Sequence, residues 1–249
     1  MTGTKRVAIL VDTETHMMPA LAREMVRRNH NLVIGNVAYG LVDELKNMGG
    51  EVEVVSEKLD LSKPDSVPKL IDAAKKRFGR YDSACIRTGA HHTGNIFEHT
   101  AEDCEPLIQH NFMAVFYALQ AIVPPLVNQG SGQVVINTST TGLRPVTWTP
   151  VYAAMRSAAN SLVRSTAMLV ADKGVTINAT GSMAIDYPAA IKDMKADTPE
   201  GLKKAVADIP MKRLGKPEEP AYFTASLIDG VATFQTGQFF SVDGGFAFA

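Results

Sequence analysis

The sequence predicts one α/β domain built on a doubly wound parallel sheet of about seven strands, with helices on both faces. Short apolar runs typical of buried strands alternate with amphipathic runs typical of helices along the whole chain. The 249 residues are enough for one full hydrophobic core. With 45% apolar and 20% charged residues, the composition is that of an ordinary globular protein. No repeat or linker interrupts the pattern, so a single domain over residues 1–249 is expected.

The first half of the chain predicts four strands with helices between them. The strands are expected at residues 7–11, 32–35, 52–55 and 83–86. Pro19 suits the first turn of the helix after the first strand, because its fixed φ matches a helix and its missing N–H needs no partner there. A second helix is expected near residues 41–48, and a third runs from the segment LDLSKPDS to Phe78.

The second half predicts three further strands, again separated by helices. They are expected at residues 132–139, 175–179 and 237–242. A long helix should begin after Thr100, where Thr-Ala-Glu-Asp resembles a capping box with Asp in place of Glu, and should run towards Pro124-Pro125. Another helix is expected around Tyr152, with Pro150 near its N-terminus, and a last one at residues 216–228.

Composition and charge exclude several classes of function. A net charge of −1 provides no basic field for nucleic acid or for an anionic membrane surface. The start, MTGTKRVAILVD, has no long apolar segment, so no signal peptide is expected, and no apolar run is expected to reach membrane-spanning length. Cys85 and Cys104 are too few for a disulfide framework. We expect both to be reduced packing residues of a cytoplasmic protein.

Three residues in the stretch STTGLRPVTWTPVYAAMR predict an acid/base site. Ser139 ends an expected strand, and Tyr152 and Arg156 stand four residues apart in the next helix, which puts them on one face. A hydroxyl at the end of a strand and a phenol near the start of the next helix can meet over the mouth of a parallel sheet, where such folds bind ligands. A fixed cation within roughly 4–6 Å can lower the tyrosine pKa of about 10 by about 1–3 units.

The spacing Ser, twelve residues, Tyr, three residues, cation resembles the active site of the short-chain dehydrogenase/reductase superfamily, in which the cation is Lys. With Arg156 as the cation, the chain most resembles the halohydrin dehalogenases, superfamily relatives without a nicotinamide cofactor. The resemblance extends along the chain and is densest at residues 77–89 and 235–245. It implies a Rossmann-like fold and a homotetramer that pairs through the long helix after Thr100 and the Tyr152 helix.

A dinucleotide site needs glycines after the first strand, so that backbone N–H groups can approach the pyrophosphate. On the superfamily's pattern the three glycine positions fall on Asp12, His16 and Met18, which all carry side chains. The other cofactor positions have also changed, with only Gly89 and Asp60 retained. They fall on Asn36 and Val37, on Ile86-Arg87-Thr88-Gly89, on Ser182-Met183 and on Tyr187. No dinucleotide cofactor is therefore expected.

The resemblance implies the interconversion of vicinal halohydrins and epoxides, or epoxide opening by a small anion. Tyr152 would take a proton from the substrate hydroxyl while Ser139 holds the same oxygen. Arg156 would stabilise the phenolate. The resulting alkoxide would displace the neighbouring halide. The first motif of the dehalogenases, which helps to shape their halide site, falls on Val11, His16 and Met18 and is not matched there.

The anion would occupy the former nicotinamide pocket. Candidate residues of the substrate or anion pocket are His16, Met18, Trp148, Ser182, Met183 and Tyr187. Each has a plainer alternative: a surface loop for His16, core packing for Met17 and Met18, and ordinary packing for Trp148, Pro145 and Tyr187. Residues 182–213 form a long excursion, which we interpret as a substrate lid.

Two further functions stay open. One is an NAD(P)-dependent oxidoreductase, against which the missing glycines argue; the other is a non-catalytic structural subunit. Asn111 matches the superfamily's fourth active-site residue, which relays through water to the missing Lys, and a structural role is the simpler interpretation. His91 and His92 lack partners at metal-ligand spacing and are expected in a solvated loop, so no metal site is expected.

Overall fold

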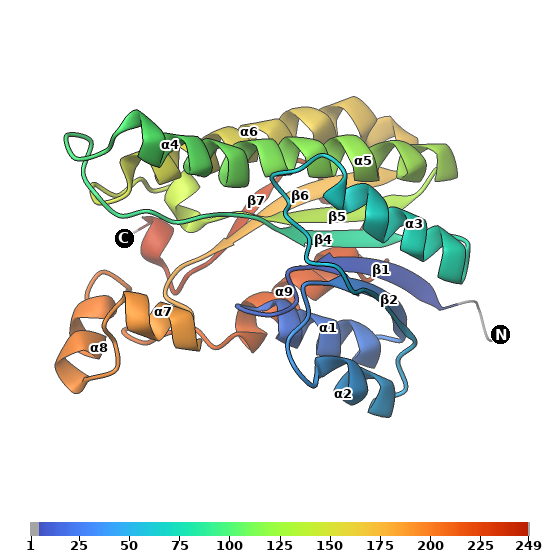
Figure 1. Ribbon diagram of the computed structural model, residues 1–249, viewed down its shortest axis with the longest axis horizontal. Helices are drawn as coiled ribbons and strands as arrows, with labels where there is room; N and C mark the ends of the chain where they lie inside the picture. Colours follow the sequence, from blue (N-terminus) through green and yellow to red (C-terminus); the bar gives the residue numbers. More distant parts are fainter. Residues whose placement is uncertain (1–4, 249) are drawn as a thin grey trace.

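The computed structural model describes residues 5–248, and within them seven strands form one parallel sheet in the order β3-β2-β1-β4-β5-β6-β7 (Figure 1). The strands are β1 (Arg6–Val11), β2 (His30–Gly35), β3 (Val52–Val55), β4 (Ser83–Arg87), β5 (Gly132–Asn137), β6 (Val175–Ser182) and β7 (Phe239–Val242). The predicted fold class is confirmed. From β1 the chain first builds outwards to β2 and β3, and then returns to β4 on the other side. The topological switch point therefore lies between the carboxyl ends of β1 and β4.

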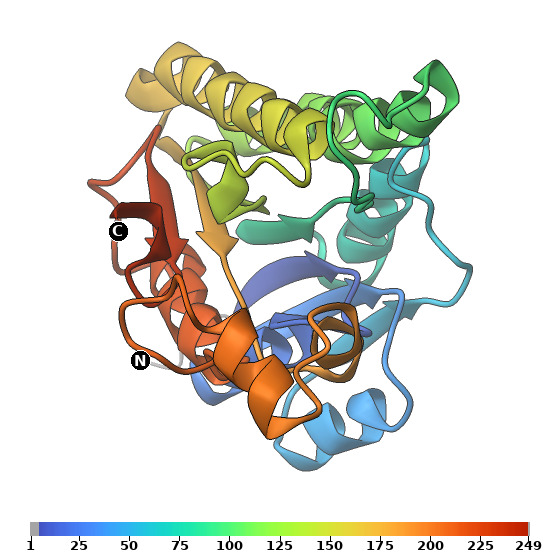
Figure 2. The same ribbon diagram turned by 90° about the vertical axis from the view of Figure 1, so that its left-hand side faces the viewer.

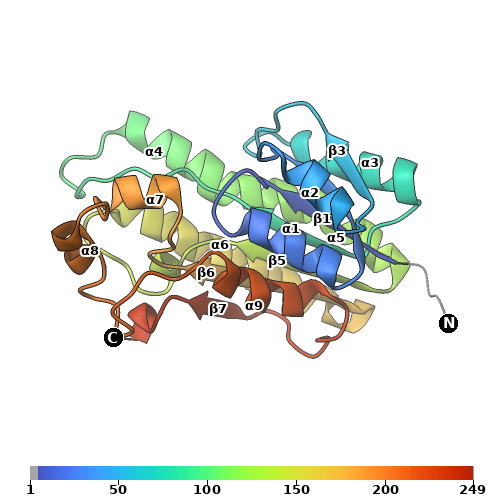
Figure 3. The same ribbon diagram turned by 90° about the horizontal axis from the view of Figure 1, so that it is seen from below.

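Helices cover both faces of the sheet because alternate strand residues point to opposite sides. Val7, Ile9 and Val11 of β1 belong to a core with the helices of one face. Ala8 and Leu10 belong to a second core on the other face. The first face carries α3 (Ser66–Phe78), α4 (Ala101–Ile108), α5 (Ala114–Gln129) and α6 (Pro150–Val170) (Figure 1). The second carries α1 (Met18–Arg27), α2 (Leu41–Asn47) and α9 (Glu218–Ile228) (Figure 3).

The long helix after Thr100 begins at the predicted capping box. The Thr100 hydroxyl accepts from Asp103 N at 3.2 Å, and the Asp103 carboxylate accepts from Thr100 N at 3.0 Å. A π-helical segment, η1 (Gln109–Met113), joins α4 to α5. The helix then continues through Pro124 and Pro125 to Gln129, beyond the expected end. Packing of the buried Ile122, Val123 and Leu126 against the core holds the helix together across the two prolines.

The helical stretch Ala101–Gln129 is long and apolar enough to cross a membrane by length and composition alone. The expectation that no run reaches this length is therefore wrong. The apolar residues have an explanation within the fold, because α5 packs against the sheet and against α3 and α6. The core helix of a globular protein can have the same length and composition.

The excursion after β6 contains more regular structure than its sequence suggests. The strand β6 runs on to Ser182, past the expected end at 179. The excursion forms two short helices, α7 (Pro188–Asp193) and α8 (Pro199–Ala205), with a small core of Ala184, Val206 and Ile209. Figure 2 looks onto this end of the molecule, where α7 and α8 lie in front of the carboxyl ends of the strands. Residues 1–4, where the signal-peptide expectation begins, and residue 249 lie outside the described residues.

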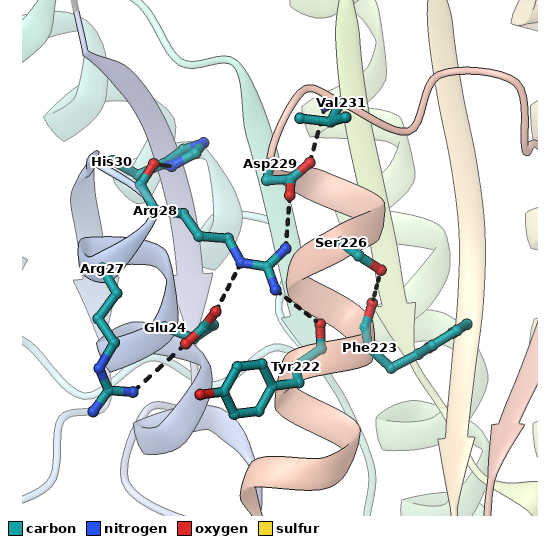
Figure 4. A network of polar contacts seen from close by, with 9 residues as sticks. All are labelled: Glu24, Arg27, Arg28, His30, Tyr222, Phe223, Ser226, Asp229 and Val231. Carbon is teal, nitrogen blue, oxygen red and sulfur yellow. Dashed lines mark hydrogen bonds and ion pairs between the residues drawn. The ribbon is translucent and has the colours of Figure 1, made fainter.

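An ion-pair network joins α1 to α9 on the second face (Figure 4). Arg28, just after α1, donates to Glu24 at 2.8 Å and to Asp229, just after α9, at 2.6 Å. Glu24 is buried, so an unpaired carboxylate there would be costly. The network therefore ties α1 to α9 beneath β1, β4 and β5.

Candidate active site

A cavity of about 170 Å³ lies at the carboxyl end of the sheet, beneath α7. It is lined by Ser139, Tyr152 and Arg156, which are the three predicted catalytic residues. Five of the six predicted pocket residues also line it: His16, Trp148, Ser182, Met183 and Tyr187. The sixth, Met18, does not, because it is fully buried in the second core, as its plainer alternative proposes. Pro145 is not among the lining residues.

Ser139 follows β5 and begins the short turn Thr140–Gly142. The Ser139 oxygen accepts two hydrogen bonds from Thr141, one from the backbone N at 3.2 Å and one from the hydroxyl at 3.0 Å. A hydroxyl that accepts from its own turn keeps its proton free to donate. Ser139 can therefore donate a hydrogen bond to an oxygen atom in the cavity.

Tyr152 lies in the first turn of α6, and Arg156 lies one turn further on. The central carbon of the Arg156 guanidinium is 5.1 Å from the centre of the Tyr152 ring. Burial raises the pKa of Tyr152, but the positive charge of Arg156 and hydrogen bonds from Ser139 and Arg156 outweigh it, so that the pKa lies below its usual value. Arg156 supplies the charge in a place where water screens it little, since it is only 4% exposed.

The loop after β4 holds Arg156 in place. Its guanidinium donates to the Thr88 hydroxyl at 3.0 Å and to the Thr88 carbonyl at 2.5 Å. Gly89 makes this close approach to the backbone possible, because a Cβ there would lie 1.9 Å from Nη2 of Arg156. Gly89 also has a φ of +134°, which side chains rarely adopt. Gly89, the one glycine retained from the superfamily's motif after the fourth strand, thus leaves room for the guanidinium of Arg156 against the backbone.

We expect Gly89→Ala to lower the free energy of unfolding by about 1–3 kcal/mol. In the variant, the positive φ is unfavourable for alanine and the new Cβ clashes with the Arg156 guanidinium. Urea unfolding measures the loss. Gly79→Ala is the matched control: Gly79 also has positive φ, at +77°, but a Cβ there would meet nothing within 4 Å. Equal losses in the two variants would contradict the role of Gly89 in leaving space for the Arg156 guanidinium.

His16 is a cavity residue, so its alternative interpretation as a surface-loop histidine is wrong. Its Nε2 lies 3.1 Å from the Ser182 hydroxyl, and its ring packs edge-on against Tyr187 at 5.2 Å. Burial and the charges of Arg87 and Arg156 lower the His16 pKa to about 3. His16 is therefore neutral at physiological pH and can exchange a hydrogen bond with Ser182 in either direction.

An ion pair that sequence reasoning missed crosses the switch point. Arg87, the last residue of β4, pairs with Asp12, the residue after β1. Arg87 lines the cavity and also a neighbouring groove of about 440 Å³, whose walls include Asp12, Asn36 and Asp60. Opposite charges at the carboxyl ends of β1 and β4 are the signal that could have found the pair, once those two strands are placed side by side.

His91 and Asn111 lie close to the cavity, His91 in its wall and Asn111 beside the loop after β4. His91 lies in an exposed loop, as expected, but its ring packs edge-on against Tyr152 at 5.0 Å and lines the cavity. The Asn111 amide donates to the carbonyls of Ala90 and Leu107, both at 2.9 Å, while its buried oxygen has no protein partner. Within residues 5–248, no group of three His, Cys, Asp or Glu side chains is placed to hold a metal ion.

Known proteins resemble this chain over almost its whole length. A family profile described as enoyl-(acyl carrier protein) reductase matches residues 18–247. The 2,5-dichloro-2,5-cyclohexadiene-1,4-diol dehydrogenase LinX of Sphingobium indicum is 27% identical over 97% of this chain and 96% of its own. The crystal structure of levodione reductase superposes with a TM-score of 0.88 at 26% identity, covering 98% of both chains. The structure of ElxO with NADP bound shares the fold, with a TM-score of 0.86 at 20% identity, over 98% of this chain and 99% of its own.

Proposed function

This chain belongs to the short-chain dehydrogenase/reductase superfamily, and from that membership we propose that it is an NAD(P)-dependent oxidoreductase interconverting a small alcohol and its carbonyl compound. One observation carries the proposal: a tyrosine of lowered pKa faces the same cavity as a serine hydroxyl at the carboxyl end of the sheet. The names of the relatives, a diol dehydrogenase and a levodione reductase, support this reaction class.

The expectation of a cofactor-independent halohydrin dehalogenase is wrong. The relatives that match the whole chain are named as dehydrogenases and reductases. The expectation of no dinucleotide cofactor is wrong for the same reason, and one structural neighbour has NADP bound. The residues of the loop after β1 led to this expectation, but the absence of glycines there does not by itself exclude a dinucleotide cofactor. Glycine is one way to let a backbone approach a phosphate, and other groups can bind the phosphate instead.

The described residues fit a dinucleotide in two parts. The groove beside Asn36 and Asp60, at about 440 Å³, is within the range of about 300–1,000 Å³ for small-molecule sites. It adjoins the cavity of Ser139 and Tyr152, and Arg87 and Thr88 line both. Asp12 and His16 keep the left-handed backbone, with φ of +62° and +58°, that glycine adopts readily. The groove would hold the adenosine end, and the cavity would hold the nicotinamide end beside the substrate.

In this reaction, residues of this chain transfer the proton to or from the substrate oxygen. When bound, the nicotinamide would supply a hydride to the carbonyl carbon in the reducing direction, or accept one from the alcohol carbon in the oxidising direction. In the reducing direction the Tyr152 phenol donates its proton to the carbonyl oxygen as negative charge develops there. Ser139 donates a hydrogen bond to the same oxygen and stabilises that charge. In the oxidising direction the Tyr152 phenolate, stabilised by Arg156, accepts the proton of the alcohol.

The test follows reduced nicotinamide by its absorbance, with NAD or NADP and a panel of small cyclic and acyclic alcohols. We expect turnover with one cofactor, and direct binding of that cofactor by calorimetric titration. Small substrates are expected because the cavity measures only about 170 Å³. Failure of both dinucleotides to bind, together with no turnover in either direction, would contradict the proposal. The homotetramer and the cytoplasmic location stay predictions.

A further inference from the structure

The cofactor's phosphates would meet an unusual loop, because Asp12, His16 and Met18 occupy the three glycine positions. Met18 is fully buried and His16 contacts Ser182, so neither side chain offers a cation to a phosphate. In a loop with bare glycines, backbone N–H groups bind the pyrophosphate. Where side chains stand at these positions, a cationic side chain between the groove and the cavity can contribute this binding instead.

Arg87 occupies that place. It ends β4 at the switch point, where open α/β sheets bind their ligands. Among residues 5–248, it is the one cationic side chain that lines both the groove and the cavity. Lys58 lines only the groove, while Arg156 lines only the cavity and is committed to Thr88. A guanidinium also suits phosphate, because its fork of donors binds two oxygens at once.

Arg87 already binds an anion, the Asp12 carboxylate. Both side chains are only partly exposed, at 22% and 24%, so the pair is less screened than one at the surface. A phosphate entering between the groove and the cavity would compete with Asp12 for the same guanidinium. Asp12 is therefore positioned to hold Arg87 in the absence of dinucleotide.

Building on the proposed function, we propose that Arg87 is the phosphate-binding residue that replaces the glycine loop, and that Asp12 is its competing counter-ion. Two consequences follow. Removing the guanidinium weakens dinucleotide binding, and removing the Asp12 charge strengthens it. The second effect depends on the first, because Asp12 competes for Arg87.

The test measures the dissociation constants of NADPH, NADH and inorganic pyrophosphate by calorimetry, without turnover. Arg87→Gln is expected to weaken dinucleotide binding about 10- to 100-fold, the effect of losing hydrogen bonds to a charged group. Asp12→Asn is expected to tighten it about 2- to 5-fold, with no gain in the Arg87→Gln background. Arg87→Lys, which keeps the charge but loses the fork, should fall between wild type and Arg87→Gln. The controls Arg77→Gln and Glu51→Gln, which break an exposed ion pair at 2.8 Å, should leave binding unchanged.

The outcomes separate the two proposals. Dinucleotide binding of equal affinity in wild type and folded Arg87→Gln, checked by circular dichroism, would overturn the role of Arg87 and leave the oxidoreductase proposal standing. A gain from Asp12→Asn that persists without Arg87 would overturn the competition. If neither wild type nor Asp12→Asn binds a dinucleotide or pyrophosphate, the inference falls together with the cofactor.

Discussion

Replacing Tyr152 with phenylalanine is expected to lower turnover by about 10²–10⁴-fold, the usual loss when a general acid–base group is removed. Phenylalanine keeps the ring that packs against His91 but has no proton to give or accept. The loss should therefore appear in kcat, in both reaction directions. The dissociation constant of the dinucleotide, measured by titration, should stay close to that of the wild type.

Tyr222→Phe is the matched control for this variant. Tyr222 lies on α9 with half of its side chain exposed, on the other face of the sheet. The same substitution there should leave kcat unchanged. Undiminished turnover in Tyr152→Phe would show that the proton transfer belongs to another group.

Replacing Arg156 with glutamine is expected to move the pH dependence of alcohol oxidation upwards by about 1–3 pH units. Oxidation needs the Tyr152 phenolate, so its rate rises as pH increases through the pKa of Tyr152. In wild type the charge of Arg156 is the main factor that lowers this pKa against the effect of burial. Without that charge the phenolate forms at higher pH. At any pH below the pKa of Tyr152 in both wild type and Arg156→Gln, the oxidation rate of the variant is lower by about tenfold for each unit by which the pKa of Tyr152 has risen.

Arg156→Lys provides the comparison, because lysine keeps the positive charge and loses the planar fork that donates to Thr88. Its pH profile should lie much closer to wild type than that of Arg156→Gln. Oxidation rates measured from about pH 6 to about pH 11 would distinguish the two. An unchanged profile in a folded Arg156→Gln protein would contradict the role of Arg156 in stabilising the phenolate.

The loop after β1 shows where residue types alone are not enough. Asp12 and His16 stand at glycine positions, and their side chains indicate a blocked phosphate site. Their backbones nevertheless adopt left-handed φ, and Met18 turns into the core. A residue type shows which conformations are easy, but the surrounding structure selects the one that is adopted. The relatives, with their dehydrogenase and reductase names, overturn the conclusion drawn from the missing glycines.

Local sequence patterns were enough to predict the parallel sheet and the grouping of Ser139, Tyr152 and Arg156. Both depend on short-range features: alternation of strand and helix periods, and residues four apart on one helix face. The pairing of Arg87 with Asp12 and the contact of His16 with Ser182 join segments 75 residues apart or more, so they became visible only in the folded chain. The order of the strands creates such contacts, and no local periodicity encodes it. The continuation of α5 through Pro124 and Pro125 also depends on tertiary structure. Packing of the helix against the core there outweighs the low helix propensity of proline.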